Sequence, residues 1–423
     1  MVFGSPRHLN LQLICSARTR VRDVLDVWPA LPLNIWLDAI GSSGGSMDNI
    51  IAGLRRSDRV SKICLLLRQS SDFGVILAEM HHSFPELTYL TLFSADRVVQ
   101  VVPDSFLGGS APHLQYLLLY HFQFLGLPKL LLSTTHLAIL QLTIPHSGYI
   151  SPEAMATVFS TSASLELLSL EFHSPRSCPH WESRPPLPLT RSVLPVLTYF
   201  RFKGVSEYLE DLVACIDAPQ LNDLEITFFN DIIFDTPQLM QFINRTSMLG
   251  ALEKAQIIFW VNRTNTKFSS NTSGYGKFEV RILCRGLDWQ ASSLEQLCTS
   301  RLRPLSMSQD LYIYERETDW KDSVESSQWL GLLHPFTAVK NLYLSKKLAP
   351  HIAPALQELV EGRIMVLPAL QNIFLEGLES SGHVPEGIGQ FVAARQSASY
   401  PIAISPWTDA KQFIMLESTL PFS

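Results

Sequence analysis

The 423-residue sequence has no run of basic residues and no closely spaced cysteines. Its 33 lysines and arginines are outnumbered by 39 aspartates and glutamates, which gives a formal net charge of −6. This balance argues against a nucleic-acid-binding surface of the usual electrostatic kind. The six cysteines form no CxxC pair and no Cys/His cluster, so we expect buried reduced thiols instead of a zinc site or a disulfide framework.

The sequence also lacks a secretory signal and an uninterrupted membrane span. The apolar part of the first fifteen residues ends too soon to be the core of a signal peptide. The most apolar stretch, residues 114–132, is interrupted by His121, Gln123, Pro128 and Lys129. We therefore expect no membrane association and a location in the cytoplasm or the nucleus.

What the sequence does contain is one short phrase that keeps returning. In the copy PELTYLTLF, apolar residues hold the first, fourth and sixth places, which are Leu87, Leu90 and Leu92. This spacing is typical of the strand in a leucine-rich repeat. Further copies are PHLQYLLLY (112–120), THLAILQLT (135–143), ASLELLSLEF (163–172), PVLTYFRFK (195–203), PQLNDLEITFF (219–229), AVKNLYLS (338–345) and PALQNIFLEG (368–377).

The spacing between copies is that of a repeat array. From Val60 to Leu370 the first apolar places are separated by steps averaging about 28 residues, if KFEVRILC (277–284) and DLYIYE (310–315) supply two weaker copies. The array is extended at its two ends by HLNLQL (8–13), LPLNIWL (31–37) and YPIAIS (400–405).

Segments with helical spacing of apolar residues lie between the strands, and each begins with a Ser, Thr or Pro suited to a helix start. They are residues 46–56, 151–163, 206–218 and 236–245. Because one such unit cannot bury its own apolar side, neighbours must stack. We therefore predict an α/β leucine-rich-repeat solenoid over residues 7–407, with a parallel concave sheet and convex helices, and a C-terminal tail at 408–423.

Two stretches are predicted to be loops. Residues 174–192 are rich in proline, and residues 262–277 are polar and contain Gly274 and Gly276. Either loop could hold a partner. Insertions that the repeat tolerates are the simpler interpretation, because surface loops accept added length at little cost.

Longer phrases of the chain resemble a known family. They are DVLDVWPALPL (23–33), VVPDSFLGGSAPHLQYLLL (101–119), GLPKLLLSTTHLAILQL (126–142), IPHSGYISPEAMATVFST (144–161) and RSVLPVLTYFRFKGVSEYLEDLVACIDAPQLNDLEITFFN (191–230). In these phrases the chain resembles basidiomycete fungal F-box proteins with leucine-rich-repeat-like arrays. The resemblance implies a substrate receptor of a cullin-type ubiquitin ligase, in which an N-terminal F-box docks on the Skp adaptor and the array holds the target.

The sequence departs from that family at the F-box itself. A predicted repeat strand starts at residue 8, so we expect the N-terminal F-box to be missing. The Skp adaptor is expected as a partner only if an F-box is present. As an alternative, residues 30–40 echo the opening of an F-box and residues 54–67 could form its second half. The glycine-rich segment 41–46 between them would break the required helix, which favours two repeats instead.

Enzyme motifs are weak. Residues 41–45 fit G-x-S-x-G with Ser43 as the nucleophile, but the downstream candidates Asp104 and His146 occupy repeat positions instead of hydrolase loops. Residues 273–277 lack the first glycine of a phosphate-binding loop. The adjacent histidines 81 and 82 point in different directions on most backbones. We therefore expect no enzymatic activity, no cofactor and no metal.

The concave face is the predicted binding surface, because the third, fifth and seventh places of each phrase point toward it. Aromatic side chains dominate its early rows and charged ones its middle rows. We predict that Tyr89, Phe93, Tyr116 and Tyr120 form an apolar contact patch and that Arg201, Lys203, Asp223 and Glu225 orient a protein partner. The alternative is that these side chains are covered as ordinary core.

The expected function is protein recognition, of the kind performed by the substrate-binding region of an F-box-type ubiquitin-ligase receptor. A stand-alone leucine-rich-repeat interaction scaffold without ligase association is the alternative. The target protein is not predicted.

Overall fold

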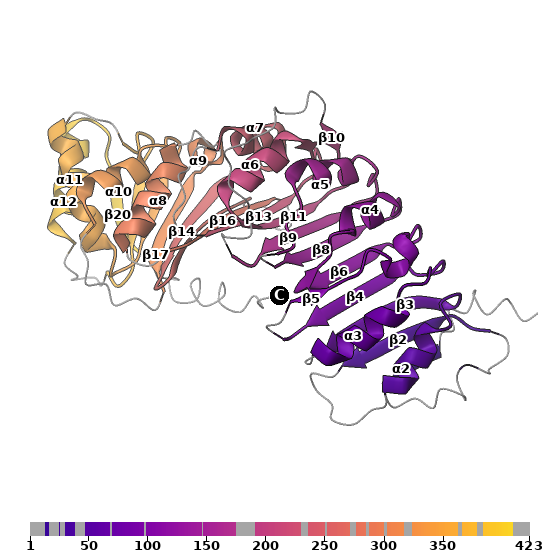
Figure 1. Ribbon diagram of the computed structural model, residues 1–423. Helices are drawn as coiled ribbons and strands as arrows, with labels where there is room; N and C mark the ends of the chain where they lie inside the picture. The colour runs from indigo at the N-terminus through magenta and orange to yellow at the C-terminus, as the bar shows by residue number, and fades with distance from the viewer. Residues whose placement is uncertain are drawn as a thin grey trace, which may run out of the picture. The chain divides into compact units, whose positions relative to one another are not determined.

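The computed structural model consists of two compact units, residues 1–220 and residues 221–423, which are described separately (Figure 1). The residues that it describes are 13–16, 25, 30–38, 47–67, 70–96, 99–145, 147–174, 191–229, 236–249, 252–270, 276–284, 287–299, 303–316, 324–362, 366–378 and 384–408.

The main sheet of the first unit is parallel, and its strands lie side by side in chain order. This arrangement is the one that a leucine-rich-repeat solenoid requires, and it confirms the predicted fold class for this unit. Its strands are β1 (Leu13–Ser16), β2 (Leu33–Asp38), β3 (Val60–Leu67), β4 (Tyr89–Ser94), β6 (Tyr116–Tyr120), β8 (Ile139–Ile144), β9 (Leu167–Phe172) and β11 (Tyr199–Gly204).

The repeated leucines form the core, as their spacing predicts. Leu87, Leu90 and Leu92 are all fully buried, and the corresponding residues of later phrases are equally buried. Burial of each such side chain contributes about 1.5–3 kcal/mol of hydrophobic free energy. The third, fifth and seventh places alternate with these leucines and lie on the other side of the sheet.

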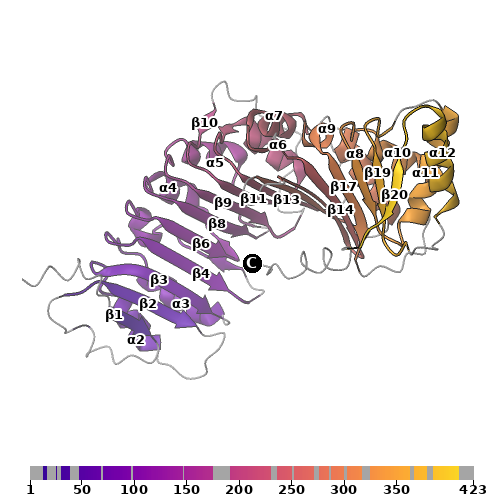
Figure 2. The ribbon, with the colours of Figure 1, turned by 180° about the vertical axis from the view of Figure 1, so that it is seen from behind.

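Helices lie against one side of the sheet and leave its other side open (Figures 1 and 2). They begin where the sequence indicates: Ser151 accepts a hydrogen bond from the backbone N–H of Ala154 at 3.2 Å, with Pro152 in the first turn. The helices of this unit are α2 (Met47–Leu54), α3 (Ser70–Glu79), η2 (Phe106–Gly109), α4 (Leu127–Leu132), α5 (Pro152–Phe159) and α6 (Ser206–Ala214). Two short parallel pairs complete it: β5 (Gln100–Val101) with β7 (Phe122–Gln123), and β10 (Ser192–Val193) with β12 (Ile216–Asp217).

The sheet of the second unit departs from chain order in one place. Its strands follow the spatial order β13, β16, β15, β14, β17, β18, β19, β20. Strand β15 is antiparallel to both β14 and β16, whereas the other pairs are parallel. The bounds are β13 (Asp223–Phe229), β14 (Lys254–Trp260), β15 (Arg263–Ser269), β16 (Lys277–Leu283), β17 (Asp310–Glu315), β18 (Asn341–Leu344), β19 (Asn372–Leu375) and β20 (Ala403–Pro406).

The predicted α/β repeat fold with a parallel sheet therefore holds for most of the second unit, and β15 is the strand that departs from it. Strands β14, β15 and β16 form an antiparallel meander that is inserted whole into the parallel sheet. Residues 277–283, which we expected to continue the array after Leu252, pair with β13, and β14 pairs with β17.

The predicted loop at 262–277 is wrong over residues 263–269, which form β15. Its side chains alternate: Thr264, Thr266 and Phe268 are fully buried, while Arg263 and Lys267 are half-buried on the other face. This period of two is that of a strand. Residues 271–275 of the expected loop, and residues 175–190 of the other one, lie outside the described residues.

The helices of the second unit pack side by side, α8 against α10, α10 against α11, and α11 against α12. Their bounds are α7 (Pro237–Arg245), α8 (Leu287–Thr299), α9 (Arg303–Met307), α10 (Ser326–Leu333), α11 (Ala349–Gly362) and α12 (Glu386–Ser397). Nowhere in the described ranges is there a helix with the length and apolar character needed to cross a bilayer.

The two segments that could have formed an F-box contain strands. Residues 33–38 are β2 and residues 60–67 are β3, and the two strands pair in parallel. The repeat interpretation is therefore confirmed there. The predicted strand at 8–13 is described only at Leu13, where β1 begins; Ser43 and residues 409–423 of the predicted tail lie outside the described part of the chain.

Candidate functional site

The open face of each sheet is the side opposite the helices, where the third, fifth and seventh places of the repeat lie. In the first unit these places align in rows across neighbouring strands. Tyr89 is in register with Tyr116, and Phe93 with Tyr120. Regular strand pairing therefore places the equivalent residues of successive repeats in rows of similar side chains.

Aromatic rings stack along two of these rows, which contain the four aromatic residues of the predicted contact patch. The Tyr89 and Tyr116 rings are 4.3 Å apart between centroids with an interplanar angle of 15°, and Phe93 and Tyr120 are also 4.3 Å apart at 13°. All four side chains are half-buried. Such an arrangement holds the rings rigid while leaving part of each accessible to a partner.

The phenol of Tyr116 is held in its neutral form. Burial, and to a smaller extent the neighbouring Tyr89, raise its pKa to about 12. At neutral pH this row therefore presents apolar rings with polar hydroxyl groups, which suits contact with a protein surface.

Two histidines continue the second row and were missed by the sequence reasoning. The His121 ring stacks on Tyr120 at 4.7 Å, and its Nε2 atom lies 3.1 Å from Nδ1 of His173. His121 has a φ of 67°, in the left-handed region that residues other than glycine seldom adopt. The chain therefore turns at His121, directly after β6, and the ring of this same residue stacks on Tyr120.

Trp36 is a third residue that the sequence did not place on this surface. It is in register with Cys64, which pairs with Thr91, and its side chain is 51% exposed. The flanking Ile35 and Leu37 are buried, so Trp36 lies on the open face. We define the aromatic face as Trp36, Tyr89, Phe93, Tyr116, Tyr120, His121 and His173.

The predicted basic pair lies at the later end of the first unit. Arg201 is 3.8 Å from the Glu171 carboxylate and 5.9 Å from the centroid of the Tyr199 ring, while Lys203 is in register with Glu171. Glu171 thus balances part of the positive charge. The ion pair is partly exposed, so it contributes at most about 1 kcal/mol to stability.

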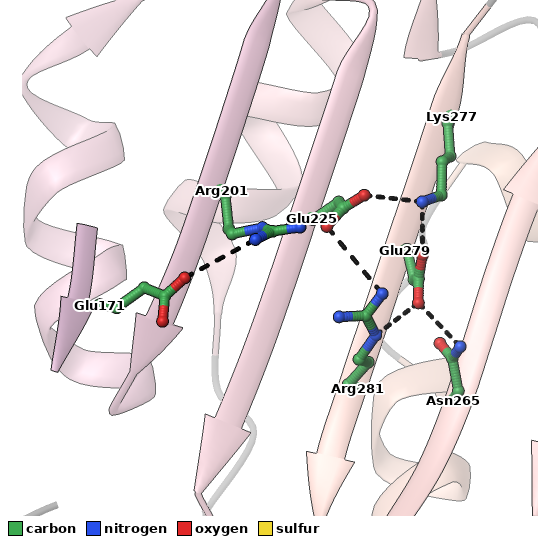
Figure 3. Close-up of polar contacts among 7 residues, drawn as sticks. All are labelled: Glu171, Arg201, Glu225, Asn265, Lys277, Glu279 and Arg281. Atoms are coloured by element: carbon green, nitrogen blue, oxygen red, sulfur yellow. Dashed lines mark hydrogen bonds and ion pairs between the residues drawn. The ribbon is translucent and has the colours of Figure 1, made fainter. Parts of the chain in front are cut away.

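The predicted acidic pair, Asp223 and Glu225, lies on β13 in the second unit, and Glu225 takes part in a network of ion pairs (Figure 3). The Lys277 ammonium is 2.7 Å from Glu225 and 2.7 Å from Glu279. Arg281 is 2.5 Å from Glu279 and 3.9 Å from Glu225. The amide of Asn265 donates a further hydrogen bond to Glu279 at 2.8 Å. Glu225, predicted to orient a partner, is thus buried and engaged within its own unit.

The charged groups of this network shift one another's pKa values. Burial by itself raises the pKa of Glu279, but Lys277 and Arg281 outweigh it and lower that pKa to about 2. Burial also raises the pKa of Asp223, and the nearby positive charge of Lys277 offsets part of this rise. The carboxylate of Glu279 therefore stays ionised throughout the physiological range.

The later strands of the second unit carry another aromatic row. Tyr312 and Tyr343 stack at 4.1 Å, and Tyr343 and Phe374 stack at 4.5 Å. Trp407, which follows β20, lies 5.7 Å from Tyr312 and 5.6 Å from Tyr343 and is itself buried. The rings of this row pack against Ile258, Tyr314 and Trp407, so this row is partly hydrophobic core.

The described residues bear on the metal site and the histidine pair considered from the sequence. They contain no group of three or more His, Cys, Asp or Glu side chains placed to hold a metal ion. The His81 and His82 rings lie 3.8 Å apart without such a third ligand among those residues. Cys64, Cys215 and Cys284 are buried free thiols, as expected, and burial raises the pKa of Cys284 to about 11.

Comparisons with known proteins gave the following results. No family model matches the chain, and no curated protein matches it. Among solved structures, the chain is similar to the leucine-rich repeat-containing protein LegL7 from Legionella pneumophila, with 13% sequence identity and a TM-score of 0.29. The match covers 92% of this chain and 98% of that one. The repeat fold rests on the strand pairing and the buried leucines.

Proposed function

We propose that this chain is a non-enzymatic protein-recognition module whose open sheet face binds a protein target. It would act as the substrate-binding region of an F-box-type ubiquitin-ligase receptor of basidiomycete fungi. The aromatic face carries the proposal. Its stacked rings stand on a rigid parallel sheet, and each keeps part of its surface accessible.

The physical reason is the energetics of protein interfaces. Tyrosine and tryptophan bury large areas at low cost in side-chain entropy, and they dominate the few residues that carry most of the binding free energy. Trp36 adds an exposed indole on the same face. An array of parallel strands gives these residues fixed positions, so little ordering is needed on binding.

The test is a comparison of partners captured by the wild-type chain and by the double variant Tyr116→Ala/Tyr120→Ala. Both side chains are half-buried on the open face, so the variant should remain folded. We expect it to lose at least one partner that the wild-type chain retains, because truncation of a central aromatic residue costs about 2 kcal/mol or more of binding free energy.

A matched control removes two exposed aromatic side chains elsewhere. Trp289 on α8 is 63% exposed and Tyr400 is 51% exposed. The variant Trp289→Ala/Tyr400→Ala should retain every partner. If the Tyr116/Tyr120 variant is folded and also retains every partner, the aromatic face is not the binding surface.

The same capture separates ligase receptor from stand-alone scaffold. Recovery of the Skp adaptor with the chain supports the receptor. Recovery of a target without the adaptor supports an interaction scaffold that has no ligase association.

A further inference from the structure

Two histidines from different repeats come together on the aromatic face of the first unit. His121 directly follows β6 and His173 directly follows β9, and β8 lies between these two strands. Neighbouring strands are about 4.8 Å apart, so the two side chains reach toward each other across the end of a strand. His121 Nε2 and His173 Nδ1 are 3.1 Å apart, although the residues are separated by 52 positions in the sequence. The linear sequence therefore gives no sign of this pair.

The two rings are inclined toward a common point. Their centroids are 4.7 Å apart and their planes are at 78° to each other. A straight hydrogen bond across the 3.1 Å between the nitrogens would separate the centroids by about 5.4 Å, because each nitrogen lies about 1.2 Å from its own centroid. Two nitrogens at the same separation, each about 2.05 Å from one zinc ion, would place the centroids about 4.8 Å apart. The observed geometry is closer to the second arrangement.

The His121 ring is held with a lone pair on the nitrogen that faces His173. Its Nδ1 atom is 3.4 Å from the backbone oxygen of Asp96. A carbonyl oxygen only accepts hydrogen bonds, so this contact keeps the proton on Nδ1 and leaves Nε2 as an electron-pair donor. Metal-binding histidines are oriented in the same way, with the other ring nitrogen bonded to a carbonyl or a carboxylate. Stacking on Tyr120 further fixes the direction of the ring.

The ligand chemistry of the pair is that of a late transition metal. Imidazole nitrogens suit zinc, copper and nickel, whereas calcium and magnesium prefer oxygen ligands. His173 is exposed and His121 is half-buried, so an ion held by both nitrogens would be in contact with solvent. The described residues offer no cluster of three or more His, Cys, Asp or Glu side chains, so water has to fill the other coordination positions.

We propose that His121 Nε2 and His173 Nδ1 together bind a divalent transition-metal ion of the zinc class on the aromatic face, with water as the remaining ligands. In the metal-free chain, the Nδ1–H group of His173 donates to His121 Nε2. When the ion binds, the His173 proton moves through solvent to its own Nε2 atom, so two neutral imidazoles coordinate the ion without net proton release. The inference goes beyond the proposed function and is tested on the chain without any partner.

Isothermal titration calorimetry of the full chain with zinc chloride is the first test, and calcium chloride is the comparison. The chain contains 12 histidines and 6 cysteines, so zinc bound elsewhere is identified by comparison with variants. We expect zinc to bind and calcium to give no heat of binding, because the pair offers nitrogen ligands.

The two variants are His121→Asn and His173→Gln. Asparagine adopts a positive φ more readily than most residues, so the first variant keeps the turn after β6 while it removes the ligand nitrogen. We expect each variant to lose one equivalent of zinc or to bind it about tenfold or more weakly, since loss of a group that only orients a ligand already costs about 10–100-fold in metal affinity.

The matched control is His113→Gln/His136→Gln, which also removes two imidazoles. Both side chains are exposed, and their rings are stacked with centroids 6.3 Å apart and an interplanar angle of 8°. The lone pair of an imidazole nitrogen lies in the plane of the ring, so rings stacked face to face do not direct two lone pairs at one ion. This variant should bind zinc like the wild type.

Modification of the wild-type chain by diethyl pyrocarbonate locates the ion and needs no variant. This reagent acylates accessible imidazole nitrogens, and mass spectrometry of peptides identifies the modified residues. Zinc should protect His121 and His173 and leave His113 and His136 reactive.

Three results would overturn the inference: no zinc binding by the wild type, folded variants of His121 and His173 that bind zinc like the control, or zinc that protects neither histidine. Circular dichroism establishes which variants are folded. These outcomes are independent of the capture test on Tyr116 and Tyr120. A chain that binds no zinc leaves the proposed function standing, and an unchanged set of partners in the Tyr116/Tyr120 variant leaves the metal site standing.

Discussion

Glu279 shows how a single residue of this sheet depends on neighbours distant in sequence. Its carboxylate is buried, yet it accepts contacts from Lys277, Arg281 and Asn265. An isolated buried carboxylate would become protonated, whereas this one is held ionised with a pKa of about 2. Removing its charge should therefore leave Arg281 without its nearest carboxylate and, among the described residues, Lys277 with Glu225 alone.

We predict that Glu279→Gln lowers the free energy of unfolding at neutral pH by about 1–3 kcal/mol, discounted because both cations are partly exposed. The pH dependence should change too. The pKa of Glu279 is lowered on folding from 4.5 to about 2, so its stabilisation is complete above pH 4.5 and is lost as the pH falls from there toward 2.

Urea unfolding followed by circular dichroism at a series of pH values measures both effects. The wild type should lose stability more steeply than Glu279→Gln as the pH falls below 4.5. Glu386→Gln, which alters an exposed carboxylate on α12, is the control and should follow the wild-type curve. Parallel curves for wild type and Glu279→Gln would contradict the assigned pairing.

For single residues, the sequence predicts where side chains lie on the sheet better than it predicts which ion pairs they form. It places Tyr89, Phe93, Tyr116 and Tyr120 in common rows because the repeat fixes their register. It does not predict that Glu225 pairs with Lys277, which is 52 residues away, because that contact depends on the inserted strand β16.

Strand β15 is the element on which the second unit departs from a simple array. It bonds on both sides, to β14 and to β16, and it buries Thr264, Thr266 and Phe268. The Phe268 ring stacks on Phe278 at 5.5 Å. A polar segment can therefore be a central strand when one of its faces is apolar enough to pack.

We predict that Thr266→Pro disrupts the second unit. Proline removes a backbone N–H, and a central strand accommodates it poorly, so the expected loss is about 3 kcal/mol or more. Val261→Pro, in the exposed turn before β15, lies outside the ladder and should cost much less. Thermal unfolding followed by circular dichroism compares the two; equal midpoints would mean that residues 263–269 are the loop that the sequence suggests.

The reason that β15 was not predicted is its composition. The stretch RTNTKFS contains Asn, Thr and Ser, which are common in loops, and Phe268 is its one large apolar residue. The leucine phrase could not reveal it, because an inserted strand need not keep the spacing of the array. Strands β4, β6, β8 and β9, by contrast, carry the full phrase and were all predicted within a few residues of their bounds.

At the scale of the whole molecule, the chain is two units in which stability accumulates from contacts between adjacent repeats. In the first unit each main strand pairs with its neighbours in chain order, and the leucines of its repeats are buried. Such a solenoid has no single compact core that every residue shares. A core mutation should then act locally.

We predict that Leu117→Ala in β6 costs about 2–4 kcal/mol, because the side chain is fully buried. Hydrogen–deuterium exchange should rise in β6 and in its partners β4 and β8, and change little in β18 and β19. Leu342→Ala in β18 should give the complementary result in β17, β18 and β19. Because nearest-neighbour stacking is what confines each effect, faster exchange throughout both units in either variant would mean that the repeats unfold as one cooperative body.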